Sequence, residues 1–206
     1  MNPTRIPLFP LDLVLFPGML LPLHIFEPRY KAMIGRCIAE NIEFGVVLSR
    51  EDRVAKTGCT AEIAQKLKDY PDGRMDILTS GRTVFQLIEL LQEKEYHEAL
   101  VEFLPDEVFP EDPRSEGRLI DVFQKCYTLV FGQPWDASGR DADTPLTYQL
   151  AAQLPLELES KQKLLETRDE SERRILLMSE INEILPQIVE RQRMRKVASG
   201  NGHRLN

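Results

Sequence analysis

Short apolar runs separated by turn residues fill the first hundred positions of the chain. Phe44–Leu48 is such a run, and Thr57–Leu67 alternates partly between apolar and polar residues. Proline presets one backbone torsion and glycine accepts a positive one, so Pro71-Asp72-Gly73 predicts a turn. Ser80-Gly81-Arg82 predicts a second turn. The strands expected around these turns are 75–78, 84–91 and 96–104, and together they indicate a small, mostly antiparallel, barrel-like domain.

One helix interrupts these strands. Pro28 suits the first turn of a helix, where its missing N–H costs nothing. Apolar residues then recur at helical spacing to about Asn41: Met33, Ile34, Cys37 and Ile38.

The segment 6–26 is almost uncharged and is long enough to cross a membrane as a helix. Its prolines and Gly18 would break such a helix repeatedly, and no small-residue cleavage pattern of a signal peptide follows. We therefore expect short extended pieces, including the apolar run 13–16, joined by proline turns and buried in a folded domain, with no membrane association.

The pattern becomes helical after a segment rich in proline and acidic residues at 105–113. We expect helices over 119–130, 146–153 and 156–166 and from about Asp169, with Gly132 ending the first and Thr144-Pro145 capping the second. The polar loop 133–143 carries Trp135, and Pro186 should kink or end the last helix.

These patterns indicate an α+β protein in which a β domain with one helix precedes a helical bundle. The expected division is 1–110 for the β domain, 111–198 for the bundle and 199–206 for a flexible tail.

The 206 residues include 26 basic and 33 acidic ones, for a net charge of −7. Binding to a nucleic-acid backbone relies on a surplus of Lys and Arg, so nucleic acid is not the expected partner. The basic C-terminal cluster is interpreted as a solvated end: Arg191, Arg193, Arg195, Lys196 and Arg204. Three widely spaced cysteines give no disulfide framework and favour a reducing, cytoplasmic setting.

The residue patterns that carry common chemistry are missing from the sequence. It contains no Gly-Lys dipeptide for a phosphate-binding loop and no glycine-rich dinucleotide turn. The isolated histidines lack neighbouring ligands, so we expect no metal and no cofactor. Ser160 beside Lys161 and Lys163 lies on a short charged helix without an oxyanion feature, so it does not indicate a serine-lysine nucleophile. We expect no enzymatic activity.

The proline-rich opening strongly resembles the N-terminal domain of the Lon ATP-dependent protease family. The motifs that carry the resemblance are Ile6-Pro7-Leu8-Phe9-Pro10-Leu11, Val14-Leu15-Phe16-Pro17-Gly18-Met19, Leu21 to Tyr30, Thr57-Gly58-Cys59-Thr60-Ala61-Glu62-Ile63, Pro71-Asp72-Gly73-Arg74, Ser80-Gly81-Arg82 and Leu154-Pro155-Leu156 with Lys161 to Glu166. They span about residues 5–190.

This resemblance implies a PUA-like pseudo-barrel followed by a helical bundle. It also implies a stand-alone, non-catalytic protein that recognises unfolded or tagged polypeptides, or a protein partner, in proteolysis or quality control. The ATPase loop and the serine-lysine dyad of the family's proteases are missing from the sequence, so a peptidase label would reflect the family name alone. A homo-oligomer is compatible with this role.

Residues around the start of the predicted helix are the candidate contacts for a polypeptide or partner: His24, Phe26, Glu27, Arg29, Tyr30 and Lys31. A helix cap and a structural ion pair are the competing interpretation of the charged members. The neighbouring residues Leu20, Leu21 and Ile25 are expected chiefly in the core, and any that stay exposed would form a docking patch. The alternative function is a PUA-like small-ligand or RNA-binding module.

Overall fold

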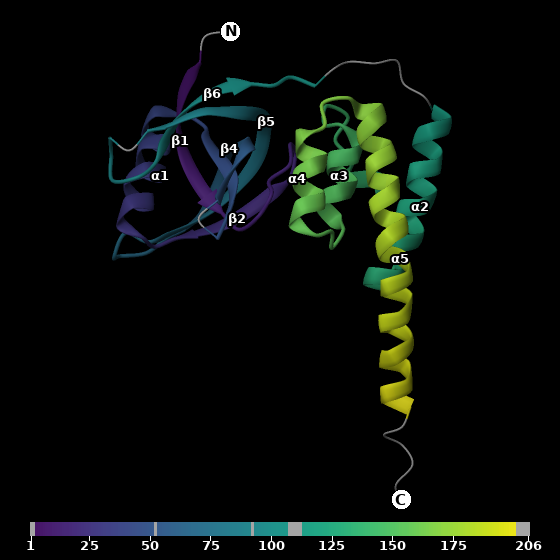
Figure 1. The fold of residues 1–206 in the computed structure, drawn as a ribbon. Helices are drawn as coiled ribbons and strands as arrows, with labels where there is room; N and C mark the ends of the chain where they lie inside the picture. Colours follow the sequence, from purple (N-terminus) through teal and green to yellow (C-terminus); the bar gives the residue numbers. More distant parts are fainter. Residues whose placement is uncertain (1–2, 52, 92, 107–112, 201–206) are drawn as a thin grey trace, which may run out of the picture.

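The computed structural model describes residues 3–51, 53–91, 93–106 and 113–200, with side chains through residue 194. A barrel of β-strands stands beside a bundle of helices, and the chain passes from one to the other after the last strand (Figure 1). The expected α+β class, with strands and one helix preceding a helical half, is confirmed.

The described strands form one six-stranded sheet with the order β2-β5-β4-β3-β1-β6. An additional pairing between β5 and β6 closes five of the strands into a barrel and leaves β2 outside the ring. The strand pairs are antiparallel except β1 with β3. The bounds are β1 Thr4–Leu11, β2 Leu20–Ile25, β3 Phe44–Arg50, β4 Arg53–Asp69, β5 Met75–Leu91 and β6 Glu98–Phe103.

The turn expected at Ser80-Gly81-Arg82 is wrong, because β5 runs through these residues without interruption. Gly81 is required there for a different reason. A Cβ atom at Gly81 would lie 2.1 Å from the carbonyl oxygen of Phe16, so only glycine lets the two backbones approach this closely. The Gly81 N–H also donates to the Met19 carbonyl at 2.9 Å. Glycine therefore marks a close crossing of two segments rather than a reversal of the chain.

The segment between β1 and β2 is buried without forming a strand. Val14, Leu15 and Phe16 are each 3% exposed or less. The Phe16 ring stacks on Tyr148 of the bundle, with ring centroids 5.5 Å apart. This segment therefore joins the core of the barrel to that of the bundle.

The helix predicted after Pro28 is confirmed as α1 (Pro28–Glu40). It ends at Asn41, which takes the left-handed conformation with φ of 51°. Its inner face packs on the barrel through Tyr30, Met33, Ile34 and Cys37.

The bundle consists of α2 (Pro113–Phe131), α3 (Leu146–Gln153), α4 (Leu158–Glu166) and α5 (Glu170–Gly200), with the 3-10 turn η1 (Ala137–Gly139) in the polar loop. The predicted cap at Thr144 is wrong. Its hydroxyl donates to Asp141 at 2.7 Å instead, and Pro145 occupies the cap position without a side-chain hydrogen bond. Asp169 caps α5 by accepting from the N–H groups of Ser171 and Glu172.

Pro186 does not end the last helix, because α5 continues through it to Gly200. Two residues of the expected tail, 199 and 200, therefore belong to α5, and 201–206 lie outside the described residues. The division at 110/111 falls outside them as well and stays a prediction.

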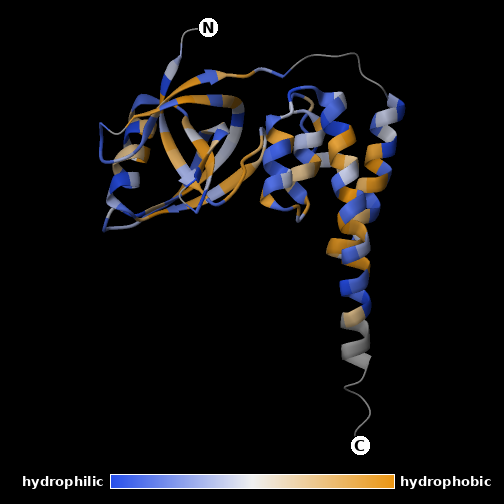
Figure 2. Ribbon diagram, viewed as in Figure 1, coloured by the Kyte–Doolittle hydropathy of each residue, from blue (hydrophilic) through white to orange (hydrophobic). Residues whose placement is uncertain are grey.

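One apolar cluster extends from the barrel into the bundle and includes Phe16, Tyr148 and Leu177. Apolar residues are concentrated along the barrel strands and the inner faces of the helices (Figure 2). Polar contacts join the same two parts: Gln162 donates to the Thr57 carbonyl at 3.0 Å, and Arg168 pairs with Asp106 at 2.6 Å. The barrel and the bundle therefore share one packed core.

Candidate functional site

Three of the four solvent-facing residues on and just beyond β2 are apolar, and the fourth is His24. Leu20 is 59% exposed, Pro22 and His24 are exposed, and Phe26 just beyond the strand is 58% exposed. These residues alternate with inward-facing ones, as the twofold period of a strand requires. The even-numbered positions therefore form a strip, the β2 strip, defined as Leu20, Pro22, His24 and Phe26.

Leu20, Leu21 and Ile25 were expected chiefly in the core, and the structure separates them into odd and even positions of the strand. Leu21 and Ile25 lie in the core, as expected. Leu20 does not, because its even position turns it outward. A solvated strand face normally carries polar residues, so the β2 strip stands apart from the pattern that solubility alone would produce.

One edge of β2 has no strand partner among the described residues. Proline in a sheet is tolerated where its nitrogen faces away from the ladder, so Pro22 indicates that its nitrogen faces the open edge. Residues two positions away share this orientation. The Leu20 and His24 N–H groups then face the open edge and can pair with an added strand.

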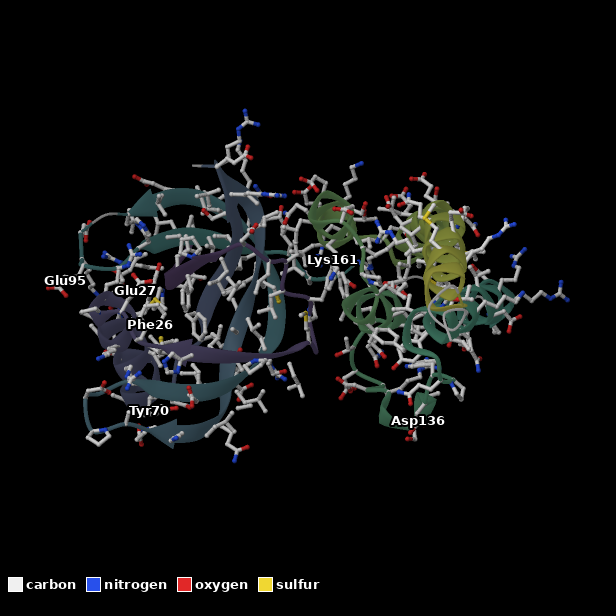
Figure 3. All side chains as sticks on the ribbon, turned by 90° about the horizontal axis from the view of Figure 1, so that it is seen from below. Phe26, Glu27, Tyr70, Glu95, Asp136 and Lys161 are labelled. Carbon is white, nitrogen blue, oxygen red and sulfur yellow. The ribbon has the colours of Figure 1, made fainter. Side chains whose placement is uncertain are left out.

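His24 belongs to an aromatic cluster at the end of the barrel remote from the bundle, where Figure 3 labels Phe26 and Tyr70. The His24 ring stacks on Phe26 at 5.9 Å and meets Tyr70 edge-on at 5.7 Å, measured between centroids. Nδ1 of His24 lies 2.5 Å from an Asp76 carboxylate oxygen, and the Tyr70 hydroxyl donates to the other oxygen at 2.9 Å. These hydrogen bonds, chiefly the one from His24, hold the pKa of Asp76 below its ordinary value.

Cationic side chains surround this cluster. The Lys68 ammonium and the Arg74 guanidinium lie 4.5 and 4.9 Å from the centroid of the Tyr70 ring. Lys31 donates to the Asp72 carbonyl at 2.9 Å, which ties the start of α1 to the β4–β5 turn. The cluster therefore combines the exposed Phe26 ring with the cations Lys68 and Arg74, of which Arg74 also pairs with Asp72 at 2.7 Å.

Three of the candidate residues, Glu27, Arg29 and Tyr30, make contacts within the protein. Arg29 and Glu27 form an ion pair at 2.8 Å, but the Glu27 side chain makes no hydrogen bond to the first turn of α1. Tyr30 is buried and stacks on Phe9, with centroids 4.1 Å apart. Burial raises the pKa of the Tyr30 hydroxyl. Tyr30 therefore contributes to the core rather than to the surface.

Sequence reasoning missed Tyr70 and Asp76 as members of the cluster. Asp76 lies opposite His24 in the antiparallel register of β2 and β5, although 52 residues separate them. No local sequence pattern predicts that His24 and Asp76 pair, because the pairing depends on the register of β2 on β5. The Pro71-Asp72-Gly73 turn was predicted, and it is this turn that returns the chain to Asp76.

A cleft of about 590 Å³ lies between the barrel and the bundle, near the first residue of β2. Gly18 and Gly81 contribute to its wall on the barrel side, and Thr144 and Tyr148 do so on the bundle side. Arg82 lies at the cleft and pairs with Glu62 at 3.3 Å. The open edge of β2 therefore runs from this cleft to Phe26.

Other candidate chemistry is not assembled. Ser160 donates to Glu180 at 2.6 Å, while burial lowers the pKa of the neighbouring Lys161. Within the described ranges, no three His, Cys, Asp or Glu side chains gather as metal ligands would. The three cysteines are buried and free. In the same part of the chain, no helix has the length and apolar character needed to span a membrane.

Known proteins are similar to this chain in sequence and in fold. The model of the ATP-dependent protease La (LON) substrate-binding domain matches residues 5–183. A Lon protease of Cytophaga hutchinsonii is 26% identical over 85% of the chain and 24% of its own length. A Lon protease 2 of Syntrophobacter fumaroxidans is 28% identical over 80% and 22%. The chain thus spans about a quarter of the length of these relatives.

Solved structures agree. The Lon N-terminal domain protein from Xanthomonas campestris superposes with a TM-score of 0.68 at 26% identity, covering 85% of this chain and 98% of its own. The N-terminal domain of the Mycobacterium avium complex Lon protease shares the fold, with a TM-score of 0.63 at 20% identity over 88% of this chain and all of its own. A family model that matches most of the chain, together with this shared fold, shows that the chain belongs to the Lon substrate-binding domain family.

Proposed function

We propose that this chain binds extended polypeptide segments along the open edge of β2, without catalysing a reaction itself, in proteolysis or protein quality control. The observation that carries the proposal is the β2 strip, an apolar surface next to an unpaired strand edge. An added strand would gain main-chain hydrogen bonds from the edge and apolar contacts from the strip. The description of the matched family as a substrate-binding domain supports the same role.

The direction of β2 defines the path of the bound segment. It begins at the cleft beside Leu20 and ends at the cationic aromatic cluster around Phe26. His24, Phe26 and Lys31 are the sequence candidates along this proposed path. Tyr30 is buried beneath the surface and packs in the core. The buried free cysteines support a reducing, cytoplasmic setting for this role.

Fluorescence anisotropy with a reduced, carboxymethylated and labelled model polypeptide tests the proposal. We expect saturable binding that weakens about tenfold in Phe26→Ala, since an exposed aromatic anchor is lost. The matched control is Ile88→Ala, another exposed apolar residue of the barrel that lies on β5 away from β2. Equal effects of the two substitutions would contradict a site at β2.

A proline substitution separates strand addition from apolar contact. Leu20→Pro removes an N–H that faces the open edge, whereas Leu20→Ala removes only the side chain. We expect Leu20→Pro to weaken polypeptide binding further than Leu20→Ala, with both variants folded by circular dichroism. Equal binding by the two variants would exclude pairing at this edge.

Single-stranded RNA is the comparison ligand in the same assay at two salt concentrations. The cations around Tyr70 are the groups that would hold a phosphate backbone, and such binding falls steeply with salt. Binding of RNA that is stronger than that of polypeptide, and sensitive to salt, would replace the proposal with the RNA-binding alternative.

A further inference from the structure

A second apolar surface lies in the bundle, in a groove between α2 and α5. Its volume is about 900 Å³, and its floor includes Leu129, Leu185, Pro186 and Val189. Val189 is 49% exposed and Leu185 is partly exposed. Polypeptide binding at β2 uses none of these residues, so the groove is a separate surface.

The lower part of α5 extends beyond the end of α2. The Gln192 side chain donates to the Leu129 carbonyl near the C-terminal end of α2, and α5 continues to Gly200 (Figure 1). Met194 lies on this continuation and is 62% exposed.

Pro186 lies in the groove wall and lacks the N–H that other residues of α5 provide. Proline has no N–H, so the helix cannot supply the usual hydrogen bond to the carbonyl four residues earlier, at Asn182. Asn182 itself lines the groove.

Acidic residues precede basic ones along α5 from residue 178 onward. Two copies of this helix in antiparallel orientation therefore have complementary charges. Glu180, Glu183 and Glu190 are the only charged residues from 178 to 190, and no acidic residue follows Glu190. Arg191 and Arg193 are exposed directly after this acidic stretch. Two such helices placed antiparallel bring acidic residues opposite basic ones, with their helix dipoles also opposed.

We infer that a second copy of this chain occupies the groove, so that two α5 helices pack antiparallel about a twofold axis near residue 188. Val189 of each copy enters the groove of the other. In this register Arg193 of one copy lies opposite Glu183 of the second copy. Such an isologous interface buries both grooves at once and closes as a dimer.

Charged residues of α2 at the rim of the groove also favour the antiparallel orientation of the two copies. Asp121 and Lys125 line the groove and are exposed. They lie beside Asn182 and Pro186, so the antiparallel register brings Asp121 toward Arg193 of the second copy and Lys125 toward Glu190. A parallel arrangement would place Asp121 beside the acidic stretch instead, where like charges repel.

Sedimentation equilibrium of the full chain at about 1 to 100 µM, the range in which dimers of this kind form, tests the inference. We expect a dimer whose dissociation constant rises about a hundredfold in Val189→Asp, which places a charge in the apolar interface. The control is Ile175→Asp on the upper part of α5, where the side chain is 70% exposed outside the groove. A monomer throughout this range, or equal effects of the two substitutions, would overturn the inference.

Charge reversal tests the register. Arg193→Glu should weaken the dimer about tenfold, because Glu183 then faces a like charge. The double variant Arg193→Glu/Glu183→Arg should recover most of the loss, since the reversed pair again attracts. Failure of the double variant to recover, with both proteins folded by circular dichroism, would overturn the antiparallel arrangement.

Discussion

Glu98 shows how a single side chain fixes one end of the barrel. It is 2% exposed, yet three cations from different segments surround it: Arg5 at 2.5 Å, Arg36 at 2.7 Å and Lys94 at 3.0 Å. Burial alone would favour the neutral carboxyl group. The hydrogen bonds from Arg5, Lys94 and Arg36 outweigh this effect and hold the pKa of Glu98 below its ordinary value. β1, α1 and the start of β6 are thereby tied together through one carboxylate.

This lowered pKa predicts an acid-sensitive part of the stability. A group with a lower pKa in the folded state stabilises the fold above its unfolded pKa, about 4.3 for glutamate, and loses that contribution as the pH falls. We expect the free energy of unfolding to fall as the pH decreases from about 5 toward 3. Glu98→Gln should flatten this dependence in urea titrations, whereas the exposed control Glu95→Gln should keep it. An unchanged slope in Glu98→Gln would show that other carboxylates account for the acid sensitivity.

The close contact between β5 and the segment before β2 places a requirement on β5 that its own sequence pattern does not reveal. Gly81 lets the backbone of Phe16 approach, and this approach positions the Phe16 ring against Tyr148. The requirement comes from packing between two segments and is stronger than the local preference of Ser-Gly-Arg for a turn.

Two glycine substitutions make this requirement measurable. Gly81→Ala forces a methyl group against the Phe16 carbonyl and should lower the free energy of unfolding by about 1–3 kcal/mol or more. Gly117→Ala, inside α2 with nothing within 4 Å of the added Cβ, should raise it by about 0.5–1 kcal/mol. Denaturant titration of both variants provides the comparison. A neutral Gly81→Ala would mean that the two segments can separate without cost.

Elements with strong local signals could be predicted from the sequence, and those set by tertiary contacts could not. α1 follows from Pro28 and its apolar spacing, and α2 ends at Gly132, whose φ is +74°. Pro186 was expected to kink or end the last helix, and α5 does not end there. The candidate residues His24 and Phe26 were found, whereas their contact with Tyr70 and Asp76 required the register of β2 on β5.

At the scale of the whole molecule, the barrel and the bundle depend on each other. Phe16 is fully buried and stacks on Tyr148 from α3. Arg173 of α5 is also fully buried and pairs with Asp106, which follows β6, at 2.6 Å. Each half would expose apolar or charged core groups without the other.

The two halves should therefore unfold together. We expect one thermal transition, with the fluorescence of Trp135 in the bundle and the far-UV circular dichroism of the whole chain changing at the same temperature. Trp135 is a suitable probe because its ring meets Phe123 edge-on at 5.1 Å. A fragment ending at residue 106 should melt at a lower temperature than the full chain. Two separate transitions would instead support independent domains with the predicted boundary near 110.

Pro22 also limits what the edge of β2 can hold. A strand added at this edge lacks one main-chain hydrogen bond, because Pro22 has no N–H to donate at the middle of the edge. Such a strand is released quickly, since affinity differences of this kind appear mainly in the dissociation rate. The same gap discourages copies of the protein from polymerising edge to edge into fibrils. Under the proposed function, the β2 edge can then bind many unfolded chains in turn without nucleating an aggregate of its own.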